Sequence, residues 1–321
     1  IKIQTERHLS VFYCLKTMSS IILLFLCLFI GIAIQRVKNF PQNTATVLNQ
    51  YILYVALPAM ALHYLPKIEL GWNLLLPASV AWIAFGLSFL LFNFLGKMYN
   101  WSKKLTGCLI ITSGLGNTSF VGIPIIQALY GDEGLNTLII VDLPGTFVVL
   151  STVGVLVATM YSNQKGTGES ILKKMFRFPP LLAFLVGLIM VLCKIDFPDI
   201  LSTTFKQLSA TISPVALISV GYQLKFKTYG KHFKFLILGL SFQLIIVPFV
   251  ILTLFYFILG KTDLATKVCI IEAAMAPMIT GAILASTHGL KPELSNMMVG
   301  YGIPLSFITI AFWYFIVECF L

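Results

Sequence analysis

The 321 residues are 58% hydrophobic and only 11% charged, against roughly 25% charged residues in a typical soluble domain. This composition excludes a water-soluble fold for most of the chain and indicates a polytopic membrane protein. The formal net charge of +10 is compatible with an anionic partner such as nucleic acid. The positions of the charged residues along the chain decide whether such a partner is needed.

Ten apolar helices are the predicted elements. In chain order they cover residues 19–36, 44–64, 73–96, 105–130, 134–161, 179–194, 201–223, 232–259, 264–288 and 293–319. Charged residues and Pro, Gly and Asn mark their ends, and most are long enough to cross a hydrocarbon core of roughly 30 Å at about 1.5 Å per residue. The sequence therefore predicts an all-α polytopic membrane protein with ten transmembrane helices.

Residues 1–17 precede the first predicted helix. The run MSSIILLFLCLF that begins at Met18 looks like a natural start that continues directly into the helix. Residues 1–17 are therefore interpreted as a non-native or flexible N-terminal extension, with a genuine short tail as the alternative. A cleaved signal peptide is disfavoured, because no small-residue cleavage site follows the apolar run.

Lysine and arginine are concentrated in alternate loops. The loops after the odd-numbered helices carry fourteen of them, whereas the loops after the even-numbered helices carry four: Lys67, Lys194, Lys261 and Lys267. The positive-inside rule makes the first set cytoplasmic, including the loop at 162–178, and places both termini outside. Because topology explains the basic charge, no nucleic-acid partner is predicted.

The two halves of the chain repeat each other. Six pairs of identical residues recur at offsets of 156 to 161: Gly31 and Gly187, Pro41 and Pro198, Pro58 and Pro214, Cys108 and Cys269, Asn136 and Asn296, and Pro144 and Pro304. An odd number of spans per copy makes the second copy enter the membrane from the opposite side. Residues 18–161 and 179–321 are thus predicted to be inverted five-helix repeats, an arrangement typical of secondary transporters.

Two apolar helices are interrupted at corresponding positions. The stretch 113–125 breaks the fourth span and the stretch 272–281 breaks the ninth, and together they supply the candidate site residues Gly116, Asn117, Thr118, Ser119, Pro124, Pro277 and Thr280. Broken backbone within a membrane is tolerated only when it is buried in protein or lines a wet cavity, so paired breaks indicate the substrate site. The half-helix starts suit an anion and the half-helix ends suit a cation or proton.

Structural roles compete with binding roles at several of these positions. Asn117 either contacts substrate or caps the following half-helix, and the two roles are compatible. Pro124 and Pro277 are interpreted as geometric. Pro58 and Pro214 are expected to kink the second and seventh spans, with plain helix irregularity as the alternative.

Two carboxyl groups lie within predicted spans, where a charge costs roughly 2.5–3.5 kcal/mol on insertion scales. Asp142 and Glu272 are predicted to couple transport to H⁺ or Na⁺; a protonated or paired structural carboxyl is the alternative. Lys206 is a weaker candidate for contact with an anion, because lysines near helix ends commonly reach the interface. His63 and His288, near span ends, are interpreted as interfacial polar residues.

Enzyme motifs are missing from the sequence. The LGKT stretch at 259–262 lacks the earlier glycine of a phosphate-binding loop, and neither HExxH nor GxSxG occurs. The six cysteines show no CxxC spacing and predict neither a metal site nor a disulfide framework. The chain is therefore predicted not to be an enzyme and to use no cofactor, so an ion gradient, the membrane potential or the substrate gradient supplies the energy.

The stretches GLGNTSFVGIPIIQALYGDEG, VDLPGTF and IEAAMAPMITGAILASTHGL closely resemble the auxin efflux carrier family of permeases, within the bile acid:sodium symporter-like superfamily. The resemblance, which covers Met18 to Leu321, implies a scaffold of spans 1, 2, 6 and 7 and a moving core of spans 3–5 and 8–10. It also implies that spans 4 and 9 cross at the substrate site and that the scaffold forms a homodimer. Family members export auxin or move organic acids such as malonate and malate.

Departures from the family pattern limit what the resemblance implies. The short 162–178 loop favours a compact bacterial-type permease of the inner membrane. Gly145 and Thr146 stand where the family often has asparagines, and Ala276 stands where a second proline is frequent. The identity of the substrate therefore does not transfer.

Together these features predict a secondary active transporter that moves a small organic anion, such as a mono- or dicarboxylate or an auxin-like acid, by alternating access. Its predicted partners are this substrate and the lipid bilayer. A channel-like facilitator and a membrane sensor of the same fold are the alternatives. Saturable counterflow separates a carrier from a channel, and the lack of a sizeable soluble output domain disfavours a sensor.

Overall fold

The computed structural model describes residues 22–23, 25–67, 71, 74–162, 179–223 and 232–321. The predicted extension 1–17 and all of the predicted loop 162–178 except its first residue lie outside the described residues. Within the described part the chain is nearly all helical, and its β-pairing is a single isolated bridge. The predicted all-α fold class is confirmed.

The first half of the described chain begins with the apolar helix Phe25–Ile34. It continues with α2 (Thr44–Tyr51), η1 (Ile52–Ala56), α3 (Leu57–Tyr64), η2 (Leu65–Lys67), α4 (Leu75–Met98), α5 (Lys103–Gly114), η4 (Thr118–Gly122), α6 (Ile123–Ile140), η5 (Val141–Phe147), η6 (Leu150–Gly154) and α7 (Val155–Tyr161). The second half consists of α9 (Pro179–Cys193), α10 (Asp199–Ser209), α11 (Ile212–Gln223), α12 (Phe233–Ser241), η7 (Phe242–Ile246), α13 (Val247–Leu252), η8 (Thr253–Ile258), α14 (Leu264–Ala273), α15 (Ile279–Thr287) and α16 (Pro292–Phe320).

Several long helices contain a wider, π-helical stretch beside a proline. A proline has no N–H for the helix ladder, and its ring collides with the carbonyl four residues earlier, so the helix widens locally. The elements η1, η4 and η7 end two residues before a proline, and η5 contains one; these prolines are Pro58, Pro124, Pro248 and Pro144. In the seventh predicted span the helix instead stops at Ser209 and resumes at Ile212, before Pro214. Helix irregularity, the alternative to a kink, is thus present beside both Pro58 and Pro214.

Five helices in the described part are long and apolar enough to cross a membrane: Thr44–Lys67, Leu75–Met98, Thr118–Tyr161, Phe233–Ile258 and Pro292–Phe320. The stretch Thr118–Tyr161 reverses at Gly131, whose φ of 64° is in the left-handed region that glycine adopts without strain. Other predicted spans are shorter, such as Pro179–Cys193. The predicted spans that begin with α5 and α14 are interrupted near their middle. Large apolar side chains such as Ile308 (69% exposed) and Met160 (68% exposed) cover the outer surface, as expected for contact with lipid.

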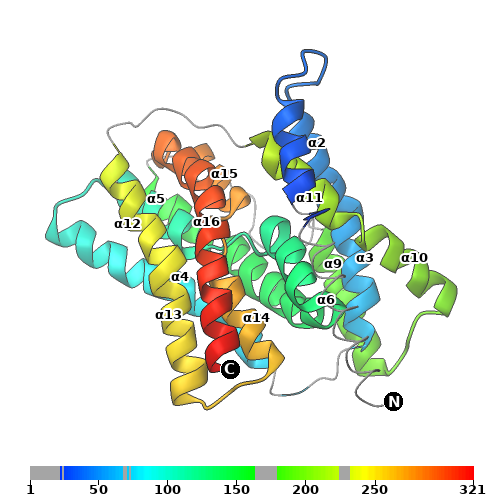
Figure 1. Ribbon diagram of the computed structural model, residues 1–321. Helices are drawn as coiled ribbons and strands as arrows, with labels where there is room; N and C mark the ends of the chain where they lie inside the picture. Colours follow the sequence, from blue (N-terminus) through cyan, green and yellow to red (C-terminus); the bar gives the residue numbers. More distant parts are fainter. Residues whose placement is uncertain (1–21, 24, 68–70, 72–73, 163–178, 224–231) are drawn as a thin grey trace.

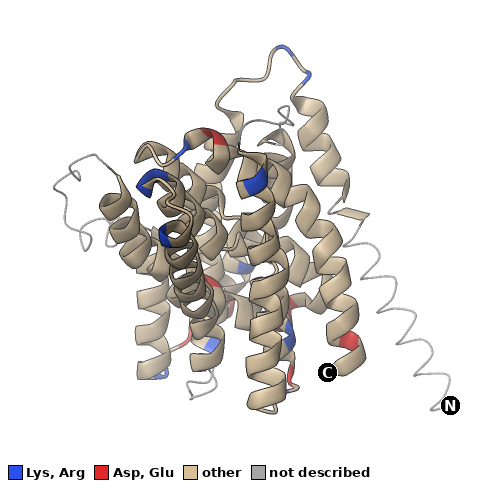
Figure 2. Cartoon of the chain, turned by 90° about the vertical axis from the view of Figure 1, so that its left-hand side faces the viewer, with Lys and Arg blue, Asp and Glu red and all other residues tan. Residues whose placement is uncertain are grey.

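The helices form two groups, visible on the right and left of Figure 1. The helices α2, α3, α9, α10 and α11 pack against one another, whereas α4, α5 and α12–α16 form the second group, with α6 between them. In Figure 2 acidic residues lie mainly toward the lower end of the molecule, and the upper end carries several lysines and arginines.

The helix Phe25–Ile34 approaches α11 of the first group unusually closely. A Cβ atom added to Gly31 would lie 2.2 Å from the carbonyl oxygen of Ile218, and one added to Gly221 would lie 2.2 Å from that of Leu28. Both contacts are with backbone, which cannot rotate away as a side chain can. Glycine at positions 31 and 221 therefore sets the distance between these helices.

The substitution Gly31→Ala is expected to destabilise the protein by about 1–3 kcal/mol, the usual cost of overpacking. The matched control is Gly86→Ala on α4, because a Cβ there meets nothing within 4 Å. Thermal unfolding of detergent-solubilised protein should show a lowered Tm for the first variant and an unchanged or raised Tm for the second. Equal Tm values would contradict the close approach.

Candidate functional site

The fourth and ninth predicted spans are each broken, and α5 and α14 are their first halves. Both helices begin with side-chain caps. The Ser102 Oγ accepts the Leu105 N–H at 3.3 Å at the start of α5. At the start of α14, the Asp263 Oδ1 accepts the Thr266 N–H at 2.9 Å. Both helices then stop after about three turns, and the chain continues in non-helical form before the next helix.

The two non-helical stretches cross and pair with each other. Gly116 and Pro277 form an antiparallel bridge. The Asn117 N–H donates to the Ala276 carbonyl at 2.7 Å, and the Met278 N–H donates to the Leu115 carbonyl at 2.9 Å. Each break thus supplies the hydrogen-bond partners that the other lacks, which is how unwound backbone is accommodated away from water.

Gln243, on η7, joins both helix ends and was not identified from the sequence. Its Nε2 donates to the carbonyls of Leu115 and Met275, each at 3.1 Å, and the side chain is 2% exposed. The carbonyl ends that were expected to face a cation or proton thus already accept hydrogen bonds. The available signal was an amide side chain in the middle of an otherwise apolar span.

Asn117 adopts the capping role. Its Oδ1 accepts the Phe120 N–H at 3.1 Å at the start of η4. The side chain is 1% exposed, and its Nδ2 donates to no described residue. A buried amide donor without a partner is costly, so capping leaves Asn117 with a donor available to a ligand.

Asp142 lies beside the start of the fourth-span half-helix. The Thr118 and Ser119 hydroxyls donate to its Oδ1 at 2.5 and 2.6 Å, and its side chain is 3% exposed. Ser119, Asp142 and Thr280 line a cavity of about 30 Å³ together with apolar residues that include Leu53 and Leu57. This cavity, large enough for about two water molecules, lies where the two groups of helices meet.

Glu272 lies on α14, the first half of the interrupted ninth span, and faces a separate cavity. It is 1% exposed, and neither carboxyl oxygen has a partner among the described residues. A Cβ on Gly122 would lie 2.6 Å from its Oε1, so glycine lets the carboxyl group rest against η4. The cavity, about 20 Å³, is also lined by Ser113, Thr118, Thr146 and Gln243. It holds space for about one water molecule.

The structure brings most of the sequence-predicted site residues together. Gly116, Asn117, Thr118, Ser119, Asp142, Glu272, Pro277 and Thr280 lie at or beside the crossing. Pro124 lies two residues after η4 in a helix that continues into α6, where the wider π-helical stretch accommodates its missing N–H. A Cβ on Gly302 of α16 would lie 2.4 Å from the Pro277 ring, so α16 packs directly on the break.

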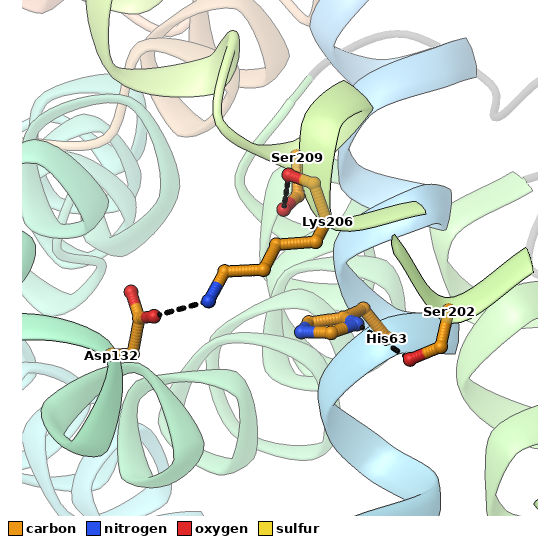
Figure 3. Close-up of polar contacts among 5 residues, drawn as sticks. All are labelled: His63, Asp132, Ser202, Lys206 and Ser209. Atoms are coloured by element: carbon orange, nitrogen blue, oxygen red, sulfur yellow. Dashed lines mark hydrogen bonds and ion pairs between the residues drawn. The ribbon is translucent and has the colours of Figure 1, made fainter. Parts of the chain in front are cut away.

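Three weaker candidates lie outside this cluster. Lys206 forms an ion pair with Asp132 at 2.9 Å, and the His63 Nδ1 is 3.1 Å from the Ser202 Oγ (Figure 3). His63 lies in the last turn of α3, where α10 packs over it and leaves it 7% exposed. His288 ends α15, with its Nδ1 2.9 Å from the Leu284 carbonyl oxygen.

The described residues include no group of three or more His, Cys, Asp and Glu side chains suited to a metal ion. The described cysteines are all unpaired.

The long apolar helices and the buried crossing of two broken helices define a multi-pass membrane protein of the transporter class. The profile of the family described as "Membrane transport protein" matches residues 16–314, and the chain belongs to this family, that of the auxin efflux carriers. It is a membrane transport protein rather than an enzyme.

Two archaeal relatives are similar over nearly their full length. An uncharacterized transporter of Methanocaldococcus jannaschii is 28% identical over 280 residues, which are 85% of this chain and 89% of the relative. An uncharacterized transporter of Methanothermobacter thermautotrophicus is 26% identical over 300 residues, which are 93% of this chain and 96% of the relative. Both names agree with the family assignment.

Replacing Gln243 with Met, of similar length, removes the donor shared by the two broken helices. The Leu115 carbonyl keeps the Met278 N–H as a partner, whereas the Met275 carbonyl loses its donor. An unpaired buried carbonyl costs about 1–3 kcal/mol, so the Tm in detergent should fall by a few degrees. The control Gln50→Met changes an exposed glutamine and should leave the Tm nearly unchanged. An unchanged Tm for the Gln243 variant would show that Gln243 does not hold the crossing together.

Proposed function

We propose that the chain is a secondary transporter that moves small organic anions, such as mono- or dicarboxylates or auxin-like acids, by alternating access. The observation that carries the proposal is the reciprocal crossing of two broken helices beside a buried cluster of hydroxyl, amide and carboxyl groups. Such crossings place helix starts and unpaired polar groups at the depth where a carrier binds its substrate.

The contacts at the crossing support two inverted repeats. Cys108 and Cys269 are 161 residues apart in the chain. The same offset relates Asn117 to Met278 and Leu115 to Ala276, so the bond from Asn117 to Ala276 in one half corresponds to the bond from Met278 to Leu115 in the other. Two sets of contacts that are exchanged in this way are what a pseudo-two-fold axis through the crossing produces.

Contacts between the outer spans support the same symmetry at an offset of 156. Gly31 packs against Gly221, and Gly187 packs against Leu65. The offset relates Gly31 to Gly187 and Leu65 to Gly221, so the two contacts are equivalent in the two repeats. The widened stretch Ile52–Ala56 likewise corresponds to the interruption between α10 and α11. Leu65 and Gly221 are not among the six identical pairs in the sequence, so their contacts support the repeat independently.

The cavity beside the half-helix starts suits a carboxylate. Helix N-termini attract anions through unpaired N–H groups and the helix dipole. Ser119 and Thr280 line the cavity with hydroxyl groups, and Asn117, at the start of η4, has an Nδ2 donor without a partner among the described residues. Asp142 occupies the hydroxyls in the present arrangement. A carboxylate substrate in this cavity would lie beside Asp142, and two carboxylates repel each other. Binding of the substrate therefore requires a proton or a cation at Asp142.

Glu272 offers a second coupling position. A buried carboxylate without a partner is strongly unfavourable, so the group is protonated or holds a cation or water in its cavity. The donors and acceptors around it suit either H⁺ or Na⁺. We propose that Asp142 and Glu272 link the movement of the organic anion to one of these ions.

In this mechanism the group containing α2, α3, α9, α10 and α11 is the scaffold, and the helices that carry the crossing are the core. Leu53 and Leu57 of the scaffold close the substrate cavity, so sliding of the core past them exposes the cavity to either side. The inner-membrane location, the external termini and the scaffold-mediated homodimer belong to the same proposal.

Uptake of labelled malonate, malate and indole-3-acetate into proteoliposomes, under imposed pH, sodium and voltage gradients, tests the proposal. Saturable uptake that responds to one gradient is expected, and Asn117→Ala should abolish it because the helix start loses its cap and its free donor. The control Asn43→Ala changes an exposed asparagine whose side chain makes no cap bond. No uptake of any of these acids by folded protein would contradict the assigned substrate class.

Asp142→Asn should leave exchange of the anion intact while removing its response to the coupling gradient, because the amide carries no charge to neutralise. The matched control is Asp196→Asn, an exposed acid. Initial rates measured with and without the gradient provide the comparison. A variant that still accumulates substrate like the wild type would exclude Asp142 from coupling.

A further inference from the structure

An ion pair connects the first group of helices to α6 at some distance from the crossing. Lys206 lies on α10, and Asp132 follows the reversal at Gly131 on α6 (Figure 3). Their charged atoms are 2.9 Å apart, and the two side chains are 53% and 51% exposed. A second polar contact joins α6 to the neighbouring helix α11, since the Ser213 Oγ donates to the Gln127 Oε1 at 2.5 Å.

A small cavity lies beneath this pair and leads toward the crossing. It measures about 30 Å³, and its lining includes Tyr64, Gln127, Asp132, Lys206 and Ser209. Met60 and Ile123 also line it, and these residues are about one helical turn from Leu57 and Phe120, which line the substrate cavity. The two cavities therefore lie in succession along the boundary between the scaffold and the core.

Lys206 carries the one positive charge among the lining residues of this outer cavity. The other charged group there is Asp132, and His63 and Lys67 lie nearby on the same side. The Lys206 aliphatic stem crosses toward α6, as Figure 3 shows, so its ammonium group lies above the boundary that an anion must pass.

We propose that Lys206 binds the carboxylate of the organic anion as it enters or leaves the outer cavity, and that Asp132 competes with the substrate for the same ammonium group. The inference rests on the proposed anion transport. In the closed arrangement Asp132 neutralises Lys206 and ties the core to the scaffold. When the core moves, the pair separates and Lys206 becomes available to the substrate.

The exposure of the pair suits this exchange. A half-exposed ion pair contributes little stability, whereas a fully buried pair is costly to separate. Water reaches both side chains, so the ammonium group can change partners during each cycle. The neutral bond between Ser213 and Gln127 adds a directional contact without adding charge.

The test measures initial rates of malonate uptake against concentration for wild type, Lys206→Gln, Asp132→Asn and the double variant. Lys206→Gln should raise KM roughly two- to fivefold or more, the effect of losing one exposed charge contact, with kcat less affected. Asp132→Asn should lower KM by a similar factor because the competitor is gone. The double variant should have the same KM as Lys206→Gln alone, because Asp132 then has no ammonium group for which to compete.

Three controls separate this role from a general effect of charge. Lys194→Gln and Glu133→Gln change exposed residues of the same charge and should behave like wild type, and Lys206→Arg should retain the wild-type KM. Added salt should raise KM for wild type and Asp132→Asn more than for Lys206→Gln, because salt screens exposed charges. Size-exclusion profiles and Tm values establish that each variant is folded.

The outcomes distinguish this inference from the proposed function. If wild type takes up malonate and Lys206→Gln matches Lys194→Gln in KM and in salt dependence, the role of Lys206 is excluded while anion transport stands. If KM rises in Lys206→Gln but Asp132→Asn does not lower it, competition by Asp132 is excluded. If the wild type takes up no carboxylate, the proposed function and this inference fail together.

Discussion

The structure depends on one constraint: backbone polar groups inside a membrane protein must find partners within the protein. Interrupting α5 and α14 leaves carbonyl and N–H groups unpaired far from water. The crossing solves this for both helices at once, through the reciprocal bonds of Asn117 with Ala276 and of Met278 with Leu115. Gln243 supplies further donors to the helix ends, and Gly122 and Gly302 let Glu272 and Pro277 lie against neighbouring backbone and helix.

The same solution creates the chemistry of the site. Helix ends turned toward the centre bring partial charges to a place where water is scarce, and a neighbouring Asp142 adds a group whose charge depends on a bound proton or cation. A static scaffold would have no use for such an arrangement, because unpaired polar groups cost stability. Their presence where two groups of helices meet supports the proposed transport site.

Local patterns in the sequence were sufficient to locate the breaks. Glycines, Asn117 and Pro277 interrupt apolar spans, and their helix-breaking properties act over a few residues, so they can be recognised without a structure. Contacts between distant segments could not be recognised in this way. Gln243 pairs with a carbonyl 128 residues away, and Lys206 meets Asp132 across the two halves. His63 lay near a predicted span end, yet packing of α10 buries it.

Counterflow tests the central claim most directly. Proteoliposomes loaded with unlabelled malonate are diluted into labelled malonate at low concentration, with no ion gradient and with the membrane potential clamped at zero. A carrier whose single crossing site faces one side at a time should produce a transient accumulation of label above equilibrium. Label that rises only to equilibrium, at a rate indifferent to the malonate inside, would indicate a pore and contradict an alternating site at the crossing.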